Sequence, residues 1–229
     1  MPTVTGTSGV RLMTVMGRVP LVSSPLRDRD GDGDGTEPTP RRPYDPREHG
    51  ALCDVCPLNG VHRPVPPKGP KSAPIAIVGE APGRTEVRTG SPFMGESGAL
   101  LRDLLYESWK LLPPGVPRLR YDEAWITNVL LCRSPGNGDL KSFLKKIETK
   151  GRKERARARA EGRVHVPVLS PIDCCRPRLL RELRRRTVIV PVGKFALKSL
   201  DGKRSEIVKW RGAPFPWVHP EEGRDADAA

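Results

Sequence analysis

The sequence predicts an α/β protein with three αβα layers, in which helices cover both faces of a central, mostly parallel four-stranded sheet. Short apolar runs near residues 75–78, 124–127, 187–192 and 215–218 alternate with helix-forming segments. This alternation is typical of a parallel sheet covered on both faces. The first run also ends in a turn rich in Gly and Pro before a helix-forming segment, which is the strand–loop–helix order of ligand-binding α/β sheets.

Three segments between or after these strands are predicted to be helices. Ala99–Leu105 carries apolar residues that suit a helix packed on a sheet, with Ser97 as its N-cap. Cys174–Leu183 has Pro177 in its first turn, where a helix tolerates proline. Lys194–Leu200 is a short helix after the third strand. These helices provide the two outer layers of the predicted fold.

The composition indicates a basic protein with a polyanionic partner. Of the 229 residues, 40 are Lys or Arg and 27 are Asp or Glu, which gives a net charge of +13. A balance this basic favours nucleic acid as the partner, ahead of an anionic membrane surface. No apolar run approaches the roughly 20 residues of a membrane span, and the start of the chain lacks the apolar core of a secretory signal. We therefore expect a cytoplasmic protein without a membrane partner, and we expect a monomer.

One domain and two tails are expected. Residues 1–47 include a stretch crowded with Pro, Gly, Asp and Arg that has almost no apolar side chains, and such a stretch cannot bury a core. We therefore predict a disordered polar tail at 1–47, a domain over 48–220 and a frayed polar tail over 221–229.

A basic insertion covers residues 139–168 within the domain. Lys141–Arg163 holds ten Lys or Arg against three Glu, and its composition favours a helix without an apolar stripe. Two interpretations stay open. The insertion is either a solvated helix or loop, or a contact with the phosphate backbone of a nucleic acid that weakens with added salt.

Chemically useful side chains follow the strand at 75–78. Gly79 ends the strand, and the next loop carries two acids, Glu80 and Glu86, and one aromatic residue, Phe93. A loop that only reverses the direction of the chain needs none of these three. Ligands bind at the carboxyl ends of strands in open α/β sheets, so this loop is a candidate site.

The other strands end in residues that suit the same site. Asn128, Gly193 and His219 each follow a predicted strand, so they would converge with the loop at one edge of a parallel sheet. The amide of Asn128 offers a donor and an acceptor to a planar ligand edge. The plain alternatives are an Asn128 that caps a turn, a Phe93 in the core and a His219 at the surface.

Five cysteines in a reducing compartment are metal ligands or inert thiols rather than a disulfide framework. Cys53 and Cys56 lie three residues apart and can place both thiolates on one metal. A redox pair is the alternative. It is disfavoured because Pro57 and the prolines between 64 and 67 break the chain where a thioredoxin-like helix would follow.

At these residues the chain resembles the iron–sulfur uracil-DNA glycosylases, family 4 of the uracil-DNA glycosylase superfamily, over roughly residues 50–220. Four blocks carry the resemblance. They are Gly79-Glu-Ala-Pro-Gly83 with Glu86 and Ser91-Pro-Phe-Met-Gly95, then Ile126–Arg133, then Cys175–Leu183 with Val188–Gly193, and finally His219-Pro220.

The resemblance implies a [4Fe–4S] cluster held by four cysteines. The matching positions are Cys53, Cys56, Cys132 and Cys175. Cys174 is adjacent and could substitute, but Cys175 stands in the Cys-x-Pro-x-Leu context of the family. A site of four thiolates also suits zinc on ligand type alone, and only the resemblance favours iron–sulfur.

The resemblance also implies a DNA repair glycosylase that hydrolyses the N-glycosidic bond of uracil in single- or double-stranded DNA and leaves an abasic site. Such an enzyme holds a flipped-out base in a pocket. Phe93 would stack on the base, Asn128 would pair with its edge, and His219 would donate to its O2. Glu86 or Glu80 would lie near the cation-like sugar. Backbone approach to the base and phosphates would use Gly79, Ala81 and Gly83.

Departures from the family pattern motivate an alternative function. His219-Pro220 is followed by Glu221 and Glu222, which would repel phosphate, and the chain ends at Ala229, before the helix that the family places after this loop. Val87 replaces an acid that often follows Glu86. The alternative is a catalytically weak or inactive nucleic-acid-binding module on the same scaffold, and a weaker third hypothesis is a zinc-bound structural domain.

Overall fold

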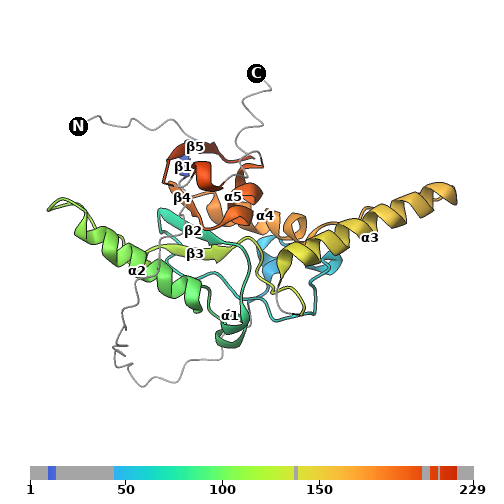
Figure 1. Ribbon diagram of the computed structural model, residues 1–229, viewed down its shortest axis with the longest axis horizontal. Helices are drawn as coiled ribbons and strands as arrows, with labels where there is room; N and C mark the ends of the chain where they lie inside the picture. The colour runs from blue at the N-terminus through green and yellow to red at the C-terminus, as the bar shows by residue number, and fades with distance from the viewer. Residues whose placement is uncertain (1–9, 14–43, 137–138, 203–206, 211, 221–229) are drawn as a thin grey trace.

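The computed structural model describes residues 10–13, 44–136, 139–202, 207–210 and 212–220 (Figure 1). The predicted tail at 221–229, with the two acids that follow His219-Pro220, lies outside these residues. Most of the predicted tail at 1–47 does so too.

One five-stranded sheet forms the centre of the protein, with the strand order β3-β2-β4-β1-β5. β2 (Ile75–Gly79) pairs in parallel with β3 (Trp125–Asn128) and with β4 (Val188–Pro191). β1 (Val10–Met13) pairs in parallel with β4, and β5 (Phe215–Val218) pairs antiparallel with β1. The predicted α/β class with a mostly parallel sheet is confirmed.

The sheet differs from the sequence prediction in its fifth strand. β1 lies inside 1–47, a range predicted to be a disordered tail. Its four residues, interrupted by Arg11, are too few to show a strand period. The strand exists because β4 and β5 supply backbone partners on both of its sides, which is a tertiary effect that no local pattern reports.

The direction of β5 follows from the position of β1 between β4 and β5. Val218 pairs with Val10 and Leu12 pairs with Val188, so the carboxyl end of β5 lies at the same edge of the sheet as the start of β4, with β1 between them. β5 therefore ends at the edge of the sheet opposite to the carboxyl ends of β2, β3 and β4.

Helix α2 (Glu96–Lys110) covers one face of the sheet. Leu101 and Leu105 of α2 pack with Ile77 and Ile126 of the central strands, and all four side chains are buried. The helix begins after Gly95 rather than after the predicted N-cap, Ser97.

Helices α4 (Pro171–Leu183) and α5 (Lys194–Asp201) cover the opposite face (Figure 1). Leu179 of α4 and Leu197 of α5 pack with Ala76 and Val78, the β2 residues that alternate with Ile77. This alternation places each helix layer on its own face of the sheet, as a three-layer αβα fold requires.

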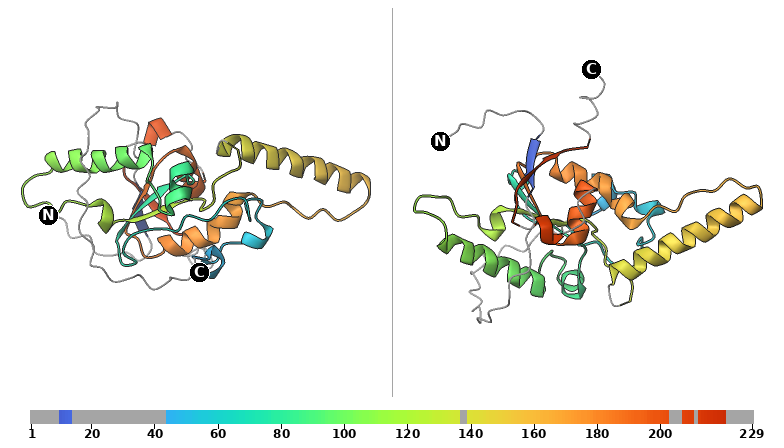
Figure 2. Two further views of the ribbon diagram at one scale, coloured as in Figure 1. Left: turned by 90° about the horizontal axis from the view of Figure 1, so that it is seen from below. Right: turned by 45° about the horizontal axis from the view of Figure 1, so that its top comes forward.

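The remaining helices lie around this core. Helix α3 (Leu140–Ala160) is a single long helix that extends away from the body of the protein (Figure 2). The short helices are α1 (Arg84–Thr89) and α6 (Ile207–Trp210), and the 3-10 turns are η1 (Pro46–His49), η2 (Cys53–Val55) and η3 (Tyr121–Glu123). None of the helices in the described ranges is long and apolar enough to cross a membrane.

Candidate active site

Gly79, Asn128 and Phe93 meet at the carboxyl edge of the sheet. Gly79 and Asn128 are paired residues at the ends of β2 and β3. A Cβ atom on Gly79 would lie 2.3 Å from Oδ1 of Asn128 and 2.7 Å from Cζ of Phe93. The amide and the ring therefore both face the Cα atom of Gly79, and this position has room only for hydrogen. The structure thus brings three of the predicted site residues together.

The backbone of Phe93 is held in an uncommon conformation. Its φ is +56°, the single positive value for a non-glycine residue in the described ranges, and bulky side chains rarely adopt this region. Arg102 donates from Nη1 to the carbonyl oxygen of Phe93 at 3.0 Å. A Cβ on Gly98 would lie only 1.6 Å from the same oxygen. Strained residues that their surroundings fix in this way cluster at functional sites.

The end of β3 is fixed from behind by Arg178 of α4, whose side chain is completely buried. Its Nη2 donates to the carbonyl oxygens of Asn128 and Val129, both at 2.8 Å. Its Nη1 donates to Oγ1 of Thr127 at 3.0 Å and to Oε1 of Glu182 at 2.9 Å. Asn128 is itself 4% exposed. The guanidinium therefore positions the backbone that carries the Asn128 amide.

The two acids of the loop have different surroundings. Oε1 of Glu86 accepts a hydrogen bond from the backbone N–H of Gly95 at 2.8 Å, and a Cβ on Gly83 would lie 2.6 Å from Oε2. The Glu86 carboxylate is thus bonded to the backbone of Gly95, lies close to Gly83 and leaves little of itself exposed. That Glu86 lies near the sugar stays a prediction.

Glu80 is half-buried. Burial raises the pKa of its carboxyl group above the ordinary 4.5, and the nearby negative charge of Asp139 raises the pKa further. Within the described part of the chain, no hydrogen bond engages this carboxylate. Ala81, the next residue, packs against the core.

The structure does not bring His219 to this site, which corrects the prediction that it converges with Asn128. β5 runs antiparallel to β1, so His219 leaves the strand at the opposite edge of the sheet. Its ring is fully buried, with Nε2 3.0 Å from the carbonyl oxygen of Leu180 and an edge-on contact to Trp217. The prediction failed because β1, which reverses the direction of β5, was not recognised in the sequence.

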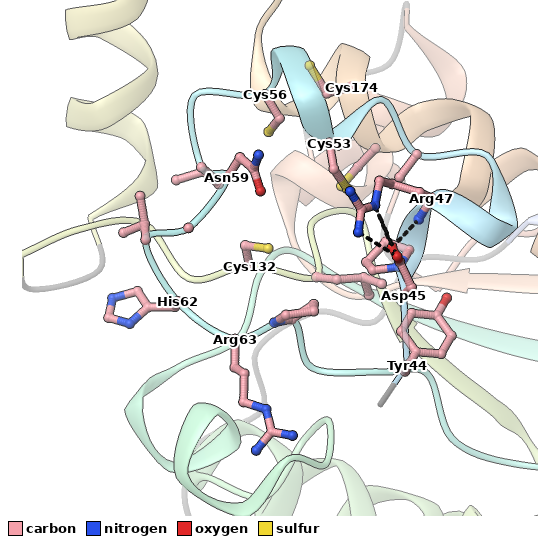
Figure 3. Close-up of a pocket in the computed structure, with 18 of the residues that line it drawn as sticks. Tyr44, Asp45, Arg47, Cys53, Cys56, Asn59, His62, Arg63, Cys132 and Cys174 are labelled. Atoms are coloured by element: carbon pink, nitrogen blue, oxygen red, sulfur yellow. Dashed lines mark hydrogen bonds and ion pairs between the residues drawn. The ribbon is translucent and has the colours of Figure 1, made fainter. Parts of the chain in front are cut away.

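All five cysteines line one cavity of about 610 Å³ (Figure 3). They come from three separate parts of the chain, and all are free thiols. Cys53 and Cys56 lie in and after η2, Cys132 follows the end of β3, and Cys174 and Cys175 lie in α4. The structure therefore brings the four predicted ligands to one place. Among the described residues, no group of three or more His, Cys, Asp or Glu side chains is arranged to hold a single metal ion.

The cavity disfavours thiolate charge in the absence of a cation. Burial, together with the smaller effect of the neighbouring thiols, raises the pKa of Cys53 to about 11 and that of Cys132 to about 12. The pKa of Cys174 is raised to about 12 by burial and by Cys56, with which it shares a hydrogen bond. Metal binding deprotonates thiols because the cation compensates their charge. A cationic centre in this cavity would therefore favour the thiolate form of these cysteines.

Sequence inspection missed Arg178 and Arg102 as residues of the site. The burial of Arg178 is not visible in the sequence, because arginine is normally a surface residue. One signal was available: Arg178 and Glu182 are four residues apart in a predicted helix and form a buried ion pair at 2.9 Å.

Comparisons with known proteins agree on one family. The model of the uracil DNA glycosylase superfamily matches residues 66–222. A Type-4 uracil-DNA glycosylase of Thermotoga maritima is 31% identical over 169 residues, which cover 72% of this chain and 70% of the relative. The proteins of the same name from Sulfurisphaera tokodaii and Archaeoglobus fulgidus are both 30% identical, and the matches cover 59% and 63% of their respective lengths.

Replacing Arg178 with Met is expected to lower the free energy of unfolding by about 3–5 kcal/mol, because Glu182 would stay buried without its cation. Urea unfolding followed by circular dichroism measures this change. Arg181→Met is the matched control, since Arg181 is exposed on the same helix and its loss should change stability by less than about 1 kcal/mol. Equal effects of the two substitutions would contradict the role given to Arg178.

Proposed function

The chain belongs to the uracil-DNA glycosylase superfamily, and we propose that it hydrolyses the N-glycosidic bond between uracil and deoxyribose in DNA. The observation that carries this proposal is the meeting of Gly79, Phe93 and Asn128 at one edge of the sheet. Monofunctional hydrolysis of this bond leaves free uracil and an abasic site.

Phe93 and Asn128 would hold the flipped-out base. An aromatic face binds a flat base through stacking, whatever the identity of that base. A side-chain amide supplies the identity, because it can donate to O4 of uracil and accept from N3–H. The glycine at position 79 supports this arrangement, because a larger residue would displace both the amide and the ring.

Glu80 is the acid that we assign to the reacting sugar. As the glycosidic bond breaks, the base departs with negative charge and the sugar becomes cation-like. A carboxylate near the sugar favours that cation and can orient the attacking water. Glu80 suits this role because it is half-buried and no hydrogen bond among the described residues occupies its carboxylate. Glu86 acts as a positioning residue that holds the loop closed.

Cys53, Cys56, Cys132 and Cys175 would hold a [4Fe–4S] cluster, with zinc as the alternative. Their thiols suit either group by ligand type, and all four line the same cavity. When bound, such a cluster would supply structural cross-linking of three chain segments rather than chemistry at the base. Cys175 and Arg178 lie one turn apart on α4, so the same helix would join the cluster to the backbone of Asn128.

The substrate of the proposed reaction is single- or double-stranded DNA. We place the activity in residues 48–220 of a monomer, in the cytoplasm. The five free thiols suit a reducing compartment, and the net charge of +13 suits a polyanionic partner.

A second candidate function is a nucleic-acid-binding module with little or no turnover. The position of His219 favours it, because the imidazole expected to donate to the departing base lies at the other edge of the sheet. We assign no chemical step to His219. The excision assay described next separates the two candidates.

Replacing Asn128 with Ala is expected to lower the rate of uracil release by about a hundredfold or more, because the base loses its edge contact. Single-turnover release of uracil from a single-stranded and a duplex oligonucleotide measures the effect. Thermal unfolding of the variant controls for misfolding. If the wild-type protein releases no uracil, the non-catalytic candidate stands. If the wild type and the variant release it equally fast, Asn128 does not read the base.

The ionised form of Glu80 is expected to govern the acid side of the pH–rate profile. Since burial raises its pKa above 4.5, activity should be lost as the pH falls through that raised value and should persist above it. Glu80→Gln should slow the reaction and remove this acid limb. Glu86→Gln should keep the limb and lower the melting temperature. If Glu86→Gln removed the acid limb and Glu80→Gln did not, Glu86 would be the acid near the sugar and Glu80 the positioning residue.

Substitution of Cys53, Cys132 or Cys175 with Ala is expected to abolish the brown colour and the broad absorption near ~400 nm of an iron–sulfur protein. Cys174→Ala is the matched control and should keep both the colour and the iron content. Absorption spectra and assays of iron, sulfide and zinc provide the measurements. A colourless protein with bound zinc would show that these cysteines hold zinc instead of a cluster.

A further inference from the structure

Helix α3 begins beside the proposed active site. Its N-cap, Asp139, accepts a hydrogen bond from the backbone N–H of Ser142 at 3.2 Å. Asp139 also lies close enough to Glu80 to raise the pKa of that carboxyl group. Leu140 is buried, and Phe143 and Leu144 pack against the core. The first turn of α3 is therefore anchored at the edge of the sheet that carries Glu80 and Asn128.

The rest of α3 leaves the body of the protein as an arm (Figures 1 and 2). Its 21 residues span about 30 Å at 1.5 Å per residue. The described chain packs on little of the distal half: Ala158 is buried there, and most side chains from 150 to 160 are exposed. A helix without a broad packed face must be stabilised by its own local contacts, or it must serve a purpose other than packing.

Positive charge is concentrated on this arm. Leu140–Ala160 holds nine Lys or Arg and two Glu, a net charge of +7 out of +13 for the whole chain. The ion pairs found at its end join Arg157 to Glu161, and Arg163 to Glu154 and Glu161. The lysines of the helix take part in none of these pairs. Most of the charge of α3 is therefore available to an external anion.

One side of α3 combines lysines with hydroxyl groups. A shallow hollow along the helix has a lining that includes four lysines and two hydroxyl side chains, in helical succession: Ser142, Lys145, Lys146, Thr149, Lys150 and Lys153. Lysine ammonium groups and Ser or Thr hydroxyls are among the usual contacts to the phosphate oxygens of DNA. The spacing of these residues by three, four, seven and eight positions places them along a single line of the helix.

We propose that α3 is a DNA-binding arm whose lysine side contacts the phosphate backbone flanking the uracil. This inference rests on the proposed function, because it places DNA at the edge of the sheet where α3 begins. An arm about 30 Å long spans roughly nine nucleotide steps at 3.4 Å each. Its contacts are independent of base sequence, so the arm increases affinity for DNA in general and the edge site selects the damaged base.

The experiment compares the salt dependence of binding between two variants of the full-length protein. The first variant carries Lys145→Gln, Lys146→Gln, Lys150→Gln and Lys153→Gln, which preserve helix propensity because Gln and Lys are similar helix formers. The matched control removes the same charge from side chains outside α3. It carries Lys71→Gln, Arg118→Gln, Arg185→Gln and Lys198→Gln, and all four of these side chains are exposed.

Binding to a uracil-free duplex is measured by fluorescence anisotropy from 50 to 200 mM salt. The α3 variant is expected to lose up to about 3.6 from the slope of log K against log salt, at roughly 0.9 for each of its four lost phosphate contacts. The control should lose less than about 1. The proposal would be overturned if the wild type and the α3 variant had equal salt slopes, or if the two variants lost equal amounts of slope. It would also be overturned if the α3 variant lost binding to anionic vesicles while its binding to DNA did not change.

The choice of DNA keeps this test separate from the test of base excision. Uracil-free DNA reports binding alone, so the slope can change even if the wild-type protein releases no base. Conversely, normal release of uracil by the wild type with unchanged slopes would remove the role of α3 and leave the proposed function intact. Helical circular dichroism of each variant confirms that the arm is folded.

Discussion

The fully buried guanidinium of Arg178 is the contact on which the site depends. It carries a positive charge in a place without exposed surface, and it satisfies that charge through Glu182, Thr127 and two backbone carbonyls at the end of β3. Such a buried pair is costly to break, because either partner alone would be an uncompensated charge. Its geometry therefore fixes the distance between α4 and β3. Through this contact, α4, which carries Cys174 and Cys175, is held against the end of β3, which carries Asn128.

The protein divides its work between two regions that α4 and β3 share. At the carboxyl edge of the sheet, Gly79 allows an amide and an aromatic ring to lie close to its own Cα atom. Beside it, thiols from three chain segments gather around one cavity. Cys132 follows Asn128 by four residues, and Cys175 precedes Arg178 by three. A group bound by these thiols would therefore stiffen the strand end that presents the amide, without itself touching a substrate.

Local patterns in the sequence were sufficient for the part of the fold with strong periodicity. Apolar runs located β2 to β5 within one or two residues, and the strand-end rule brought Gly79, Phe93 and Asn128 together. Helix α1 was missed because its loop is rich in Gly and Pro. Strand β1 was missed because its stability comes from two distant partners, and the wrong position of His219 followed from that omission. Arg178 could not be placed because burial of a charge depends on partners that only the tertiary structure brings together.

The place of β1 in the sheet also constrains the order in which the protein can assemble during synthesis. β1 is synthesised long before its partners, because its parallel partner β4 begins at Val188 and its antiparallel partner β5 at Phe215. At about 5–20 residues per second, the first strand waits roughly ten to forty seconds for its neighbours. During that interval its backbone lacks both partners that it has in the finished sheet. The part of the sheet formed by β1 and β5 therefore closes only after β5 has been synthesised, so two strands that are distant in the sequence complete the sheet together.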